Sequence, residues 1–430
     1  MPANHAVIAG GARTPFAKSG TALRKMTAVE LGVAAVREAV ARSGLDPSRI
    51  DTVIIGNVAC PADAANISRV IAVTAGLPEM APAHTVNRNC ASGMEAVAQA
   101  AHLVTTGQAR AVVAGGVESM SNIPLLLSEE LKEILFAARR AKSWPARLGA
   151  WSRLRPRHLK PVIGIEAGLT DPLCGLNMGE TAEVLAAEFG VTREAQDRFA
   201  LESHKRATAA AALLREEMTP LFPPGGRASK PVHDDVGPRP NQTMEALARL
   251  KPYFDRARGT ITAGNSSPIT DGAAALVIAD EETLKEMGGA APLARIRAWG
   301  AAGLSPRRMG LGPAHAVPIV LARAGLRLAD IDLVEINEAF AAQVIACVMA
   351  MASDRFAREE LSLPAAIGEL RPEATNVNGG AIALGHPVGA SGARLVLTLA
   401  SEMRRRGAGL GLATLCVGGG QGQAIVLESA

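Results

Sequence analysis

The chain has 430 residues, which is long enough for about two or three domains. Apolar residues make up 48% and aromatic residues only 3%, with abundant Gly and Ala, which favours the close helix–sheet packing of an α/β enzyme and excludes a disordered chain. The formal net charge is +4, from 45 basic and 41 acidic residues, and this near-balance indicates no partner by itself.

The cysteines and the N-terminal sequence indicate a reducing compartment. The five cysteines are Cys60, Cys90, Cys174, Cys347 and Cys416. They are odd in number, widely spaced and without paired metal-ligand spacing, so we expect reduced thiols and no metal site. The first residues lack the basic and apolar regions of a secretory signal, and no run of 18 apolar residues occurs, so we expect a cytoplasmic protein.

A weak internal repeat links residues 35–57 with residues 316–338. The matched positions are Gly44, Leu45, Ile50 and Asp51 in the first copy and Gly325, Leu326, Ile331 and Asp332 in the second. Each copy predicts a helix that ends at Gly, a short loop, and a strand that begins after Asp. Strands that alternate with helices imply a parallel sheet in each half, although generic βα units in an Ala-rich chain could produce the same likeness.

Cys90 lies in VNRNCASGMEAVAQAA, where a strand-like approach ends and a helix begins. Free N–H groups and the helix dipole at such a position lower the pKa of a cysteine, so we expect a thiolate there. Taken alone, the residue could equally be a small buried apolar side chain. A strand-like segment, ARAVVAGG, follows the predicted helix.

Residues 121–250 interrupt the repeat with Pro-, Arg- and Gly-rich stretches, and we interpret them as an inserted loop domain that carries a few helices. Within it, residues 134–165 hold eight basic and no acidic side chains. These are Arg139, Arg140, Lys142, Arg147, Arg153, Arg155, Arg157 and Lys160. Together with Trp144, Trp151 and several Leu, the composition is typical of a helix lying on a membrane or a partner protein, but a solvated loop or a site that attracts CoA phosphates is also open. We expect no nucleic-acid binding, because no aromatic stacking platform accompanies the charge.

The chain then returns to a strand-like run at 273–280, which we expect to complete the first sheet. In the second half, Asn337-Glu338-Ala339-Phe340 follows a strand, and His386 lies in a Gly-rich loop able to expose an imidazole. Cys416 ends an apolar strand and runs into Val417-Gly418-Gly419-Gly420. Strand carboxyl ends favour active sites in α/β folds, so these loops could converge.

These segments resemble the thiolase family over nearly the whole chain. NCASGMEA is similar to the segment of the family's nucleophile, NEAF to that of its asparagine, GGAIALGHPVGASGAR to that of its histidine, and CVGGGQGQA to that of its second cysteine. ITAGNSSPITDGAA at 261–274 resembles the segment that lines the pantetheine of coenzyme A.

The resemblance implies a duplicated α/β thiolase fold, in which two βαβαβαββ halves stack as αβαβα layers with an inserted loop domain. The expected boundaries are 1–120 for the first half, completed by 251–282, 121–250 for the insertion, and 283–430 for the second half.

The resemblance also implies the roles of individual residues. Cys90 would carry the acyl group, and His386, Cys416 and Asn337 would complete the catalytic set. His386 and Asn337 would form one oxyanion hole, and the N–H groups of Cys90 and Gly418 the other. The implied CoA and substrate contacts are Ser267, Lys251, Ala263, Gly264, Phe340 and Met178.

The implied reaction is the thiolytic cleavage of 3-ketoacyl-CoA in fatty-acid β-oxidation, with coenzyme A as co-substrate and no permanently bound cofactor. Asn337 stands where trifunctional-enzyme β-subunits often carry His, and 175–183 lacks a His before Met178, which favours medium or longer substrates. A biosynthetic acetoacetyl-CoA thiolase and a non-catalytic acyl-CoA- or lipid-binding relative are the alternatives. A decarboxylating ketoacyl-synthase is disfavoured by Cys416.

The resemblance implies a homodimer or homotetramer. The segment 131–161 resembles an extra region of trifunctional-enzyme β-subunits, which makes a hydratase/dehydrogenase α-subunit and a membrane surface candidate partners.

Overall fold

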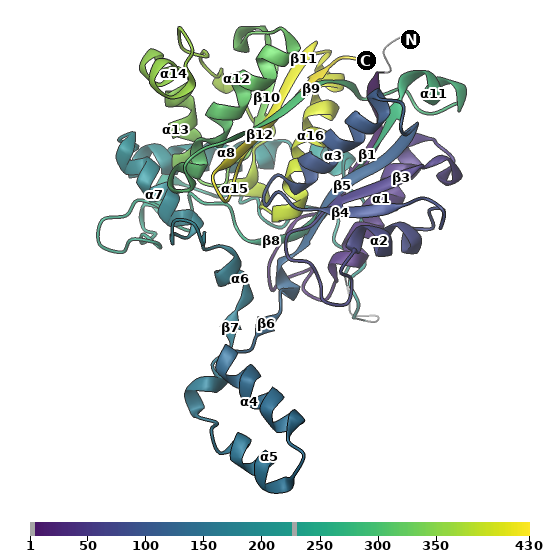
Figure 1. The fold of residues 1–430 in the computed structure, drawn as a ribbon. Coiled ribbons are helices and arrows are strands. Elements are labelled where there is room, and N and C mark those ends of the chain that lie inside the picture. The colour runs from purple at the N-terminus through teal and green to yellow at the C-terminus, as the bar shows by residue number, and fades with distance from the viewer. Residues whose placement is uncertain (1–4, 226–229) are drawn as a thin grey trace.

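A mixed β-sheet runs through the body of the protein (Figure 1). This computed structural model describes residues 5–225 and 230–430, and within them the sheet has ten strands. Nine follow the order β10-β11-β12-β9-β1-β8-β5-β3-β4, and the short β2 pairs with β8. The strands are β1 (Ala6–Arg13), β2 (Ala17–Lys18), β3 (Thr52–Gly56), β4 (Ala83–Val86), β5 (Ala111–Ser119), β6 (Leu125–Leu126), β7 (Val162–Ile163), β8 (Thr270–Asp280), β9 (Ala294–Gly303), β10 (Leu333–Ile336), β11 (Leu410–Val417) and β12 (Gln421–Glu428).

Helices cover both outer faces of the sheet, and two further helices pack between its two halves. They are α1 (Ala28–Ser43), α2 (Ile67–Ala75), α3 (Ser92–Thr105), α4 (Glu129–Arg140), α5 (Trp144–Trp151), α6 (Gly164–Gly168), α7 (Met178–Glu188), α8 (Arg193–Ala209), α9 (Ala211–Glu216), α10 (Met244–Ala248), α11 (Glu281–Glu286), α12 (Gly312–Ala324), α13 (Ala341–Met351), α14 (Asp354–Leu361), α15 (Ala381–Leu384) and α16 (Val388–Arg406). No helix in the described part of the chain is long and apolar enough to span a membrane.

The two copies of the repeat fold alike, as the sequence predicts. α1 and α12 both end at a glycine in the left-handed region, Gly44 at φ 70° and Gly325 at φ 67°, where a side chain would be strained. Strand β3 follows α1 and pairs in parallel with β5, and strand β10 follows α12 and pairs in parallel with β11. The run at 273–280 lies in β8, which pairs with β1 and β5, so the prediction that it completes the first sheet is confirmed.

The predicted αβαβα layering is confirmed, and its middle layer is α3 packed against α16. One core joins these two helices to the inner faces of both sheet halves, while α1 with α2 and α12 with α13 cover separate outer cores. The halves are also hydrogen-bonded to each other, because β1 pairs with β9 at Val7 and Ile8. The two stacked sheets are thus one continuous sheet.

The predicted insertion has two parts that lie in different places. Its first part leaves the body on a stalk of two antiparallel strands, β6 and β7, and carries α4 and α5 at the far end (Figure 1). Leu131 and Ile134 of α4 are buried in this helical hairpin. Its later helices, α7 and α8, instead pack against α13 of the second half.

Candidate active site

Cys90 lies in a tight turn between β4 and α3. Asn89, just before it, has φ 45°, a left-handed conformation that a non-glycine residue adopts at a cost. Helix α3 begins at Ser92, and its N-cap residue, Ala91, supplies no side-chain cap. The turn therefore presents Cys90, which is only partly exposed, just before the start of α3, and it is closed by the Ala91 and Ser92 N–H groups, which donate to backbone carbonyl oxygens of the same turn.

Burial raises the pKa of Cys90, and the charge of Glu118 raises it further. The backbone N–H groups of Gly418 and of Cys90 itself hydrogen-bond to the sulfur and lower its pKa, but they do not outweigh burial. The expectation of a resting thiolate is therefore wrong, because the cost of desolvating the charge exceeds the help from the helix start. Cys90 is a thiol at rest and needs a base.

The Gly418 loop is held against the Cys90 turn by two side chains that the sequence analysis missed. Asn89 donates from Nδ2 to the Gly418 carbonyl oxygen at 2.8 Å. Asp171 accepts from the Gly419 N–H at 3.0 Å and is buried. These bonds direct the Gly418 N–H towards the sulfur of Cys90.

Cys416 lies at the end of β11, buried in an apolar cluster that includes Met178 and Phe340. Burial raises its pKa well above the ordinary value, and the nearby thiols of Cys90 and Cys347 raise it further. A thiol held neutral next to another thiol is suited to give a proton rather than to attack.

His386 is buried, contrary to the expectation that its loop exposes the imidazole. It follows Gly385, whose φ of 109° suits glycine. Its Nδ1 lies 2.6 Å from Ser391 Oγ, and that hydroxyl donates to the Pro387 carbonyl oxygen at 3.0 Å. With the hydroxyl hydrogen directed at Pro387, the tautomer that completes this chain of hydrogen bonds has its hydrogen on Nδ1 and its lone pair on Nε2.

Nε2 of His386 is buried and has no hydrogen-bond partner among the described residues. Burial, with a smaller contribution from the positive charge of Arg394, lowers the pKa of His386 to about 4. The imidazole is therefore neutral, with a free lone pair on Nε2 that can accept a proton.

Asn337 follows β10 and is fully buried, with neither its Oδ1 nor its Nδ2 partnered within the described chain. A buried amide left unpaired typically costs about 1–3 kcal/mol, so a site that keeps one is organised to bind a polar group. The structure brings Cys90 close to Gly418 and to Cys416, and buries His386 and Asn337 at strand and loop ends of the second half.

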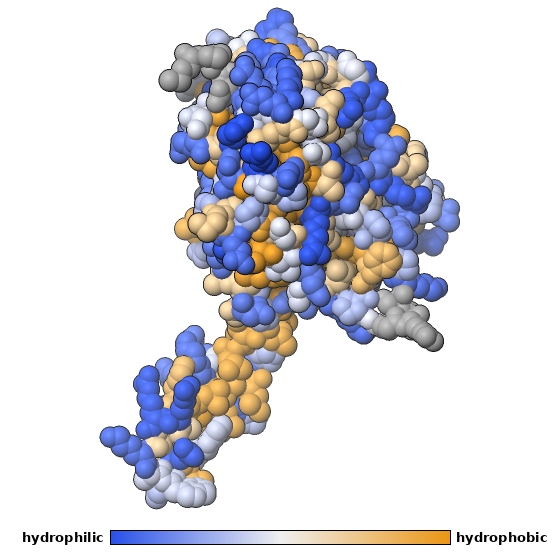
Figure 2. All heavy atoms as spheres, turned by 90° about the vertical axis from the view of Figure 1, so that its right-hand side faces the viewer, coloured by the Kyte–Doolittle hydropathy of each residue, from blue (hydrophilic) through white to orange (hydrophobic). Residues whose placement is uncertain are grey.

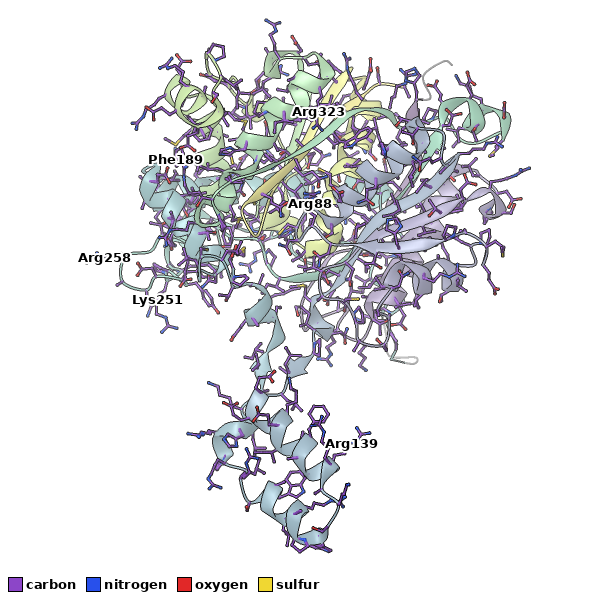
Figure 3. The ribbon with its side chains drawn as sticks, viewed as in Figure 1. Arg88, Arg139, Phe189, Lys251, Arg258 and Arg323 are labelled. Atoms are coloured by element: carbon purple, nitrogen blue, oxygen red, sulfur yellow. The ribbon has the colours of Figure 1, made fainter. Side chains whose placement is uncertain are left out.

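The residues expected to contact CoA lie in different surroundings. Ser267 donates from Oγ to the Ala339 carbonyl oxygen, next to Phe340. Ala263 is exposed, and Gly264 packs so closely that an added Cβ would lie 2.5 Å from Leu250 Cδ1. Lys251 is exposed at the outer edge of the body, on the side that also carries Arg258 (Figure 3).

Glu118 is a further residue that the sequence analysis missed. It is the one charged residue in β5, a buried apolar strand, and it lies at the strand's carboxyl end. The sequence signal that could have identified it is a single acidic residue near the end of an otherwise apolar strand. Its carboxylate contacts both the first half and the loop of His386.

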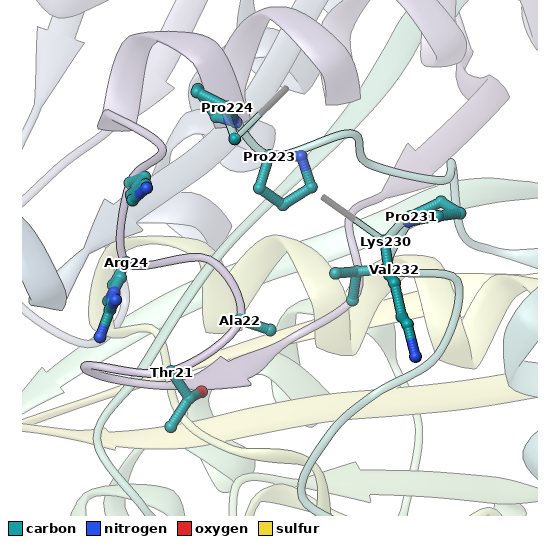
Figure 4. Close-up of a pocket in the computed structure, with 10 residues that line it drawn as sticks. Thr21, Ala22, Arg24, Pro223, Pro224, Lys230, Pro231 and Val232 are labelled. Atoms are coloured by element: carbon teal, nitrogen blue, oxygen red, sulfur yellow. The ribbon is translucent and has the colours of Figure 1, made fainter. Parts of the chain in front are cut away.

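An open hollow of about 480 Å³ is lined by Thr21, Arg24, Lys230 and several prolines, and includes none of the predicted site residues (Figure 4). Among residues 5–225 and 230–430, no group of three or more His, Cys, Asp or Glu side chains is arranged to hold a metal ion.

Comparison with known proteins covers both halves of the chain. Residues 6–282 match the family model described as thiolase, N-terminal domain, and residues 290–429 match thiolase, C-terminal domain. The chain is 43% identical to the 3-ketoacyl-CoA thiolase of Erwinia tasmaniensis, over 98% of this chain and 96% of that protein. It is 42% identical to the 3-ketoacyl-CoA thiolase of Escherichia fergusonii, with the same coverage.

Solved structures give the same result. Human mitochondrial 3-ketoacyl-CoA thiolase is similar with a TM-score of 0.85, 35% identity and full coverage of both chains. The Bacillus anthracis acetyl-CoA acetyltransferase is similar with a TM-score of 0.86 and 39% identity, over 99% of each chain.

Proposed function

This chain belongs to the thiolase family, and from that premise we propose that it cleaves 3-ketoacyl-CoA with free CoA to give acyl-CoA and acetyl-CoA. The observation that carries the proposal is the pair of neighbouring thiols of raised pKa, and it is supported by a neutral buried imidazole whose Nε2 has no partner among the described residues. The reaction is the degradative one, as in fatty-acid β-oxidation, and it reverses as a Claisen condensation.

In the first half-reaction, His386 Nε2 takes the proton of Cys90, and the sulfur attacks the 3-keto carbon. The bond between C2 and C3 breaks, and its electron pair forms the enolate of acetyl-CoA. The enolate oxygen is stabilised by the protonated Nε2 of His386 and by a water held by Asn337. Cys416 then gives its proton to C2, and acetyl-CoA leaves.

In the second half-reaction, the Cys416 thiolate takes the thiol proton of CoA, and the CoA sulfur attacks the acyl group on Cys90. The tetrahedral oxyanion lies at the N–H groups of Cys90 and Gly418. Its collapse breaks the bond to the Cys90 sulfur, which takes its proton back from His386, and acyl-CoA leaves. The support for this oxyanion hole is that both N–H groups already hydrogen-bond to the Cys90 sulfur, so they are oriented before substrate arrives.

The remaining contacts follow the same scheme. Met178 and Phe340 lie in the apolar cluster with Cys416 and line the acyl side. Ser267, Ala263 and Gly264 contact the pantetheine of CoA, and Lys251 attracts its phosphates. No permanently bound cofactor takes part.

Thiolysis rates on 3-ketoacyl-CoA substrates from C4 upwards test the proposal. We expect parallel lines in double-reciprocal plots, because the acyl-enzyme separates the two half-reactions, and higher kcat/KM on medium or longer chains than on C4. Activity confined to C4 would instead support a biosynthetic acetoacetyl-CoA thiolase, and no activity on any chain length would contradict the function.

We propose that the protein is a cytoplasmic homodimer or homotetramer. All five cysteines are free thiols, which suits a reducing compartment. In the described chain, β4 is the last strand at its end of the sheet, and it is only partly buried. An unpaired edge of this kind, next to the Cys90 turn, is suited to pair with a second copy.

The helical hairpin, defined here as residues 125–163, is proposed to contact a membrane surface, with a hydratase/dehydrogenase subunit as an additional partner. Figure 2 shows hydrophobic surface along the stalk and one side of the hairpin. Trp144 is 70% exposed and Leu125 65% exposed. None of its eight basic residues between 134 and 165 has an ion pair within the described chain, and Arg139 extends from the hairpin (Figure 3). A basic surface with exposed Trp and Leu favours anionic lipid.

We expect Arg139→Glu/Arg153→Glu to weaken binding to vesicles that contain anionic phospholipid by at least about tenfold, since each basic residue near such a surface contributes about 1 kcal/mol. Cosedimentation measures the effect. The matched control is Arg49→Glu/Lys205→Glu, which makes the same charge change on the exposed body. Equal loss in both double variants, or no loss in the first, would contradict the membrane contact.

A further inference from the structure

The loop that carries His386 is anchored by a carboxylate from the other half of the fold. Glu118 Oε2 accepts from the N–H of Gly389, in the first turn of α16, at 3.0 Å. The same oxygen accepts from the Val58 N–H at 3.1 Å, and Oε1 accepts from the Ala59 N–H and from Asn57 Nδ2 at 3.0 Å each. Glu118 is wholly buried, and each carboxylate oxygen accepts two hydrogen bonds.

β5 and α16 pack so closely that there is no space for a side chain between them. A Cβ added at Gly116 would lie 1.9 Å from the Gly389 carbonyl oxygen, and one added at Gly389 would lie 2.9 Å from Glu118 Oε2. The turn that begins α16 also holds Ser391, which receives the Nδ1 hydrogen of His386. The carboxylate thus fixes the turn that sets both the place and the tautomer of the imidazole.

The internal repeat gives this contact a counterpart. Ile55 pairs with Gly115 in the first half, and its repeat partner Ile336 pairs with Thr414 in the second. Thr414 lies 299 positions after Gly115 (414 − 115), as Ser391 lies 299 after Ser92 (391 − 92). The same offset relates Gly389 to Cys90.

The two equivalent helix starts are therefore used differently. In the first half, the N–H of Cys90 is directed at its own sulfur together with the N–H of Gly418. In the second half, the N–H of Gly389 is covered by Glu118. The position 299 residues after Glu118 (417 − 118) is the apolar Val417, so no carboxylate covers Cys90.

We propose that Glu118 is a positioning residue, whose carboxylate occupies the anion position of the second half and so holds His386 over the anion position that the first half offers to substrate. This inference rests on the thiolase function proposed above, because it places His386 at the reacting atoms. Burial raises the pKa of Glu118 to about 7, while its four N–H donors favour the carboxylate.

The test is steady-state thiolysis at pH 8.5, where Glu118 is ionised. In Glu118→Gln an amide NH2 group replaces one carboxylate oxygen. Because this group cannot accept a hydrogen bond, two of the four donors lose their acceptor. We expect kcat to fall by about 10- to 100-fold, with KM for CoA unchanged within about twofold, since the CoA contacts lie elsewhere. The matched control is Glu335→Gln, which removes another buried carboxylate that binds α16, but through the Arg394 side chain.

The double variant Asn57→Asp/Glu118→Gln provides the rescue. It reverses the hydrogen bond between residues 57 and 118, so the new amide oxygen at position 118 can accept from Gly389 and Val58 as in the unaltered protein. The rescue is partial, because the Ala59 N–H loses its acceptor and the Val117 carbonyl oxygen loses its donor. We expect the kcat of the double variant to be about tenfold higher than that of Glu118→Gln and within about tenfold of that of the unaltered protein. The second comparison stands even if the single variant does not fold.

Equal kcat losses in Glu118→Gln and Glu335→Gln at matched thermal stability would overturn the proposal, as would a raised KM with kcat unchanged or a double variant no better than the single one. The unaltered protein is assayed first. If it cleaves no 3-ketoacyl-CoA, the function fails; if it cleaves and the variants behave alike, only the role of Glu118 fails.

Discussion

Cys90→Ala is expected to abolish both half-reactions, with a loss of about 10⁴-fold or more in kcat, because no other group in the site can hold the acyl chain. The variant should still bind CoA and fold normally, since the side chain is small and only partly buried. Radiolabelled acetyl-CoA measures the effect directly, as the unaltered protein retains one acetyl group on Cys90 and the variant retains none.

Cys60→Ala is the matched control, because Cys60 is an exposed thiol whose sulfur donates to the backbone oxygens of residues 64 and 65. It should label and turn over as the unaltered protein does. Acetyl trapped on Cys60 or Cys174, or turnover that survives in Cys90→Ala, would assign the nucleophile elsewhere and reopen the non-catalytic alternative.

Cys416→Ser is expected to separate the two chemical tasks of the site. Acylation of Cys90 by acyl-CoA should continue, while exchange of the α-protons of acetyl-CoA should fall by about 10²- to 10⁴-fold. The pKa of Cys416 is already raised well above its ordinary value by burial and by the other two thiols, and a serine hydroxyl is a far weaker acid than a thiol. Loss of solvent deuterium incorporation into acetyl-CoA is the measurement.

Cys347→Ser is the control for a buried thiol, since Cys347 donates to the Gly310 carbonyl oxygen within α13's packing and a hydroxyl can do the same. Its exchange rate should stay near that of the unaltered protein. Exchange at the normal rate in Cys416→Ser would reject Cys416 as the acid and base.

Much of the fold could be predicted from the sequence because its signals are local. The helix ends at Gly44 and Gly325 can be recognised from the glycines themselves, because each depends only on the local backbone conformation. The apolar runs of β5 and β11 are likewise recognisable without their partners. The pairing of β1 with β9, which makes one sheet from two halves, joins residues about 290 apart and leaves no local pattern.

The candidate reactive side chains could be proposed from the sequence for a related reason. Cys90, His386, Asn337 and Cys416 each lie in a segment with its own motif. Their charge states were not predictable, because the pKa of Cys90 and of His386 depends on how deeply other segments bury them. The supports were missed for the same reason, since Glu118, Asn89 and Asp171 act through bonds to segments far along the chain.

The middle layer of α3 against α16 has a consequence for synthesis. α3 ends at Thr105 and α16 begins at Val388, so the chain between them takes about 15 to 60 s to make at about 5–20 residues per second. During that interval the apolar face of α3, including Met94 and Val97, has emerged and has no partner to cover it. We therefore expect the nascent chain to be prone to aggregation until its last helix appears.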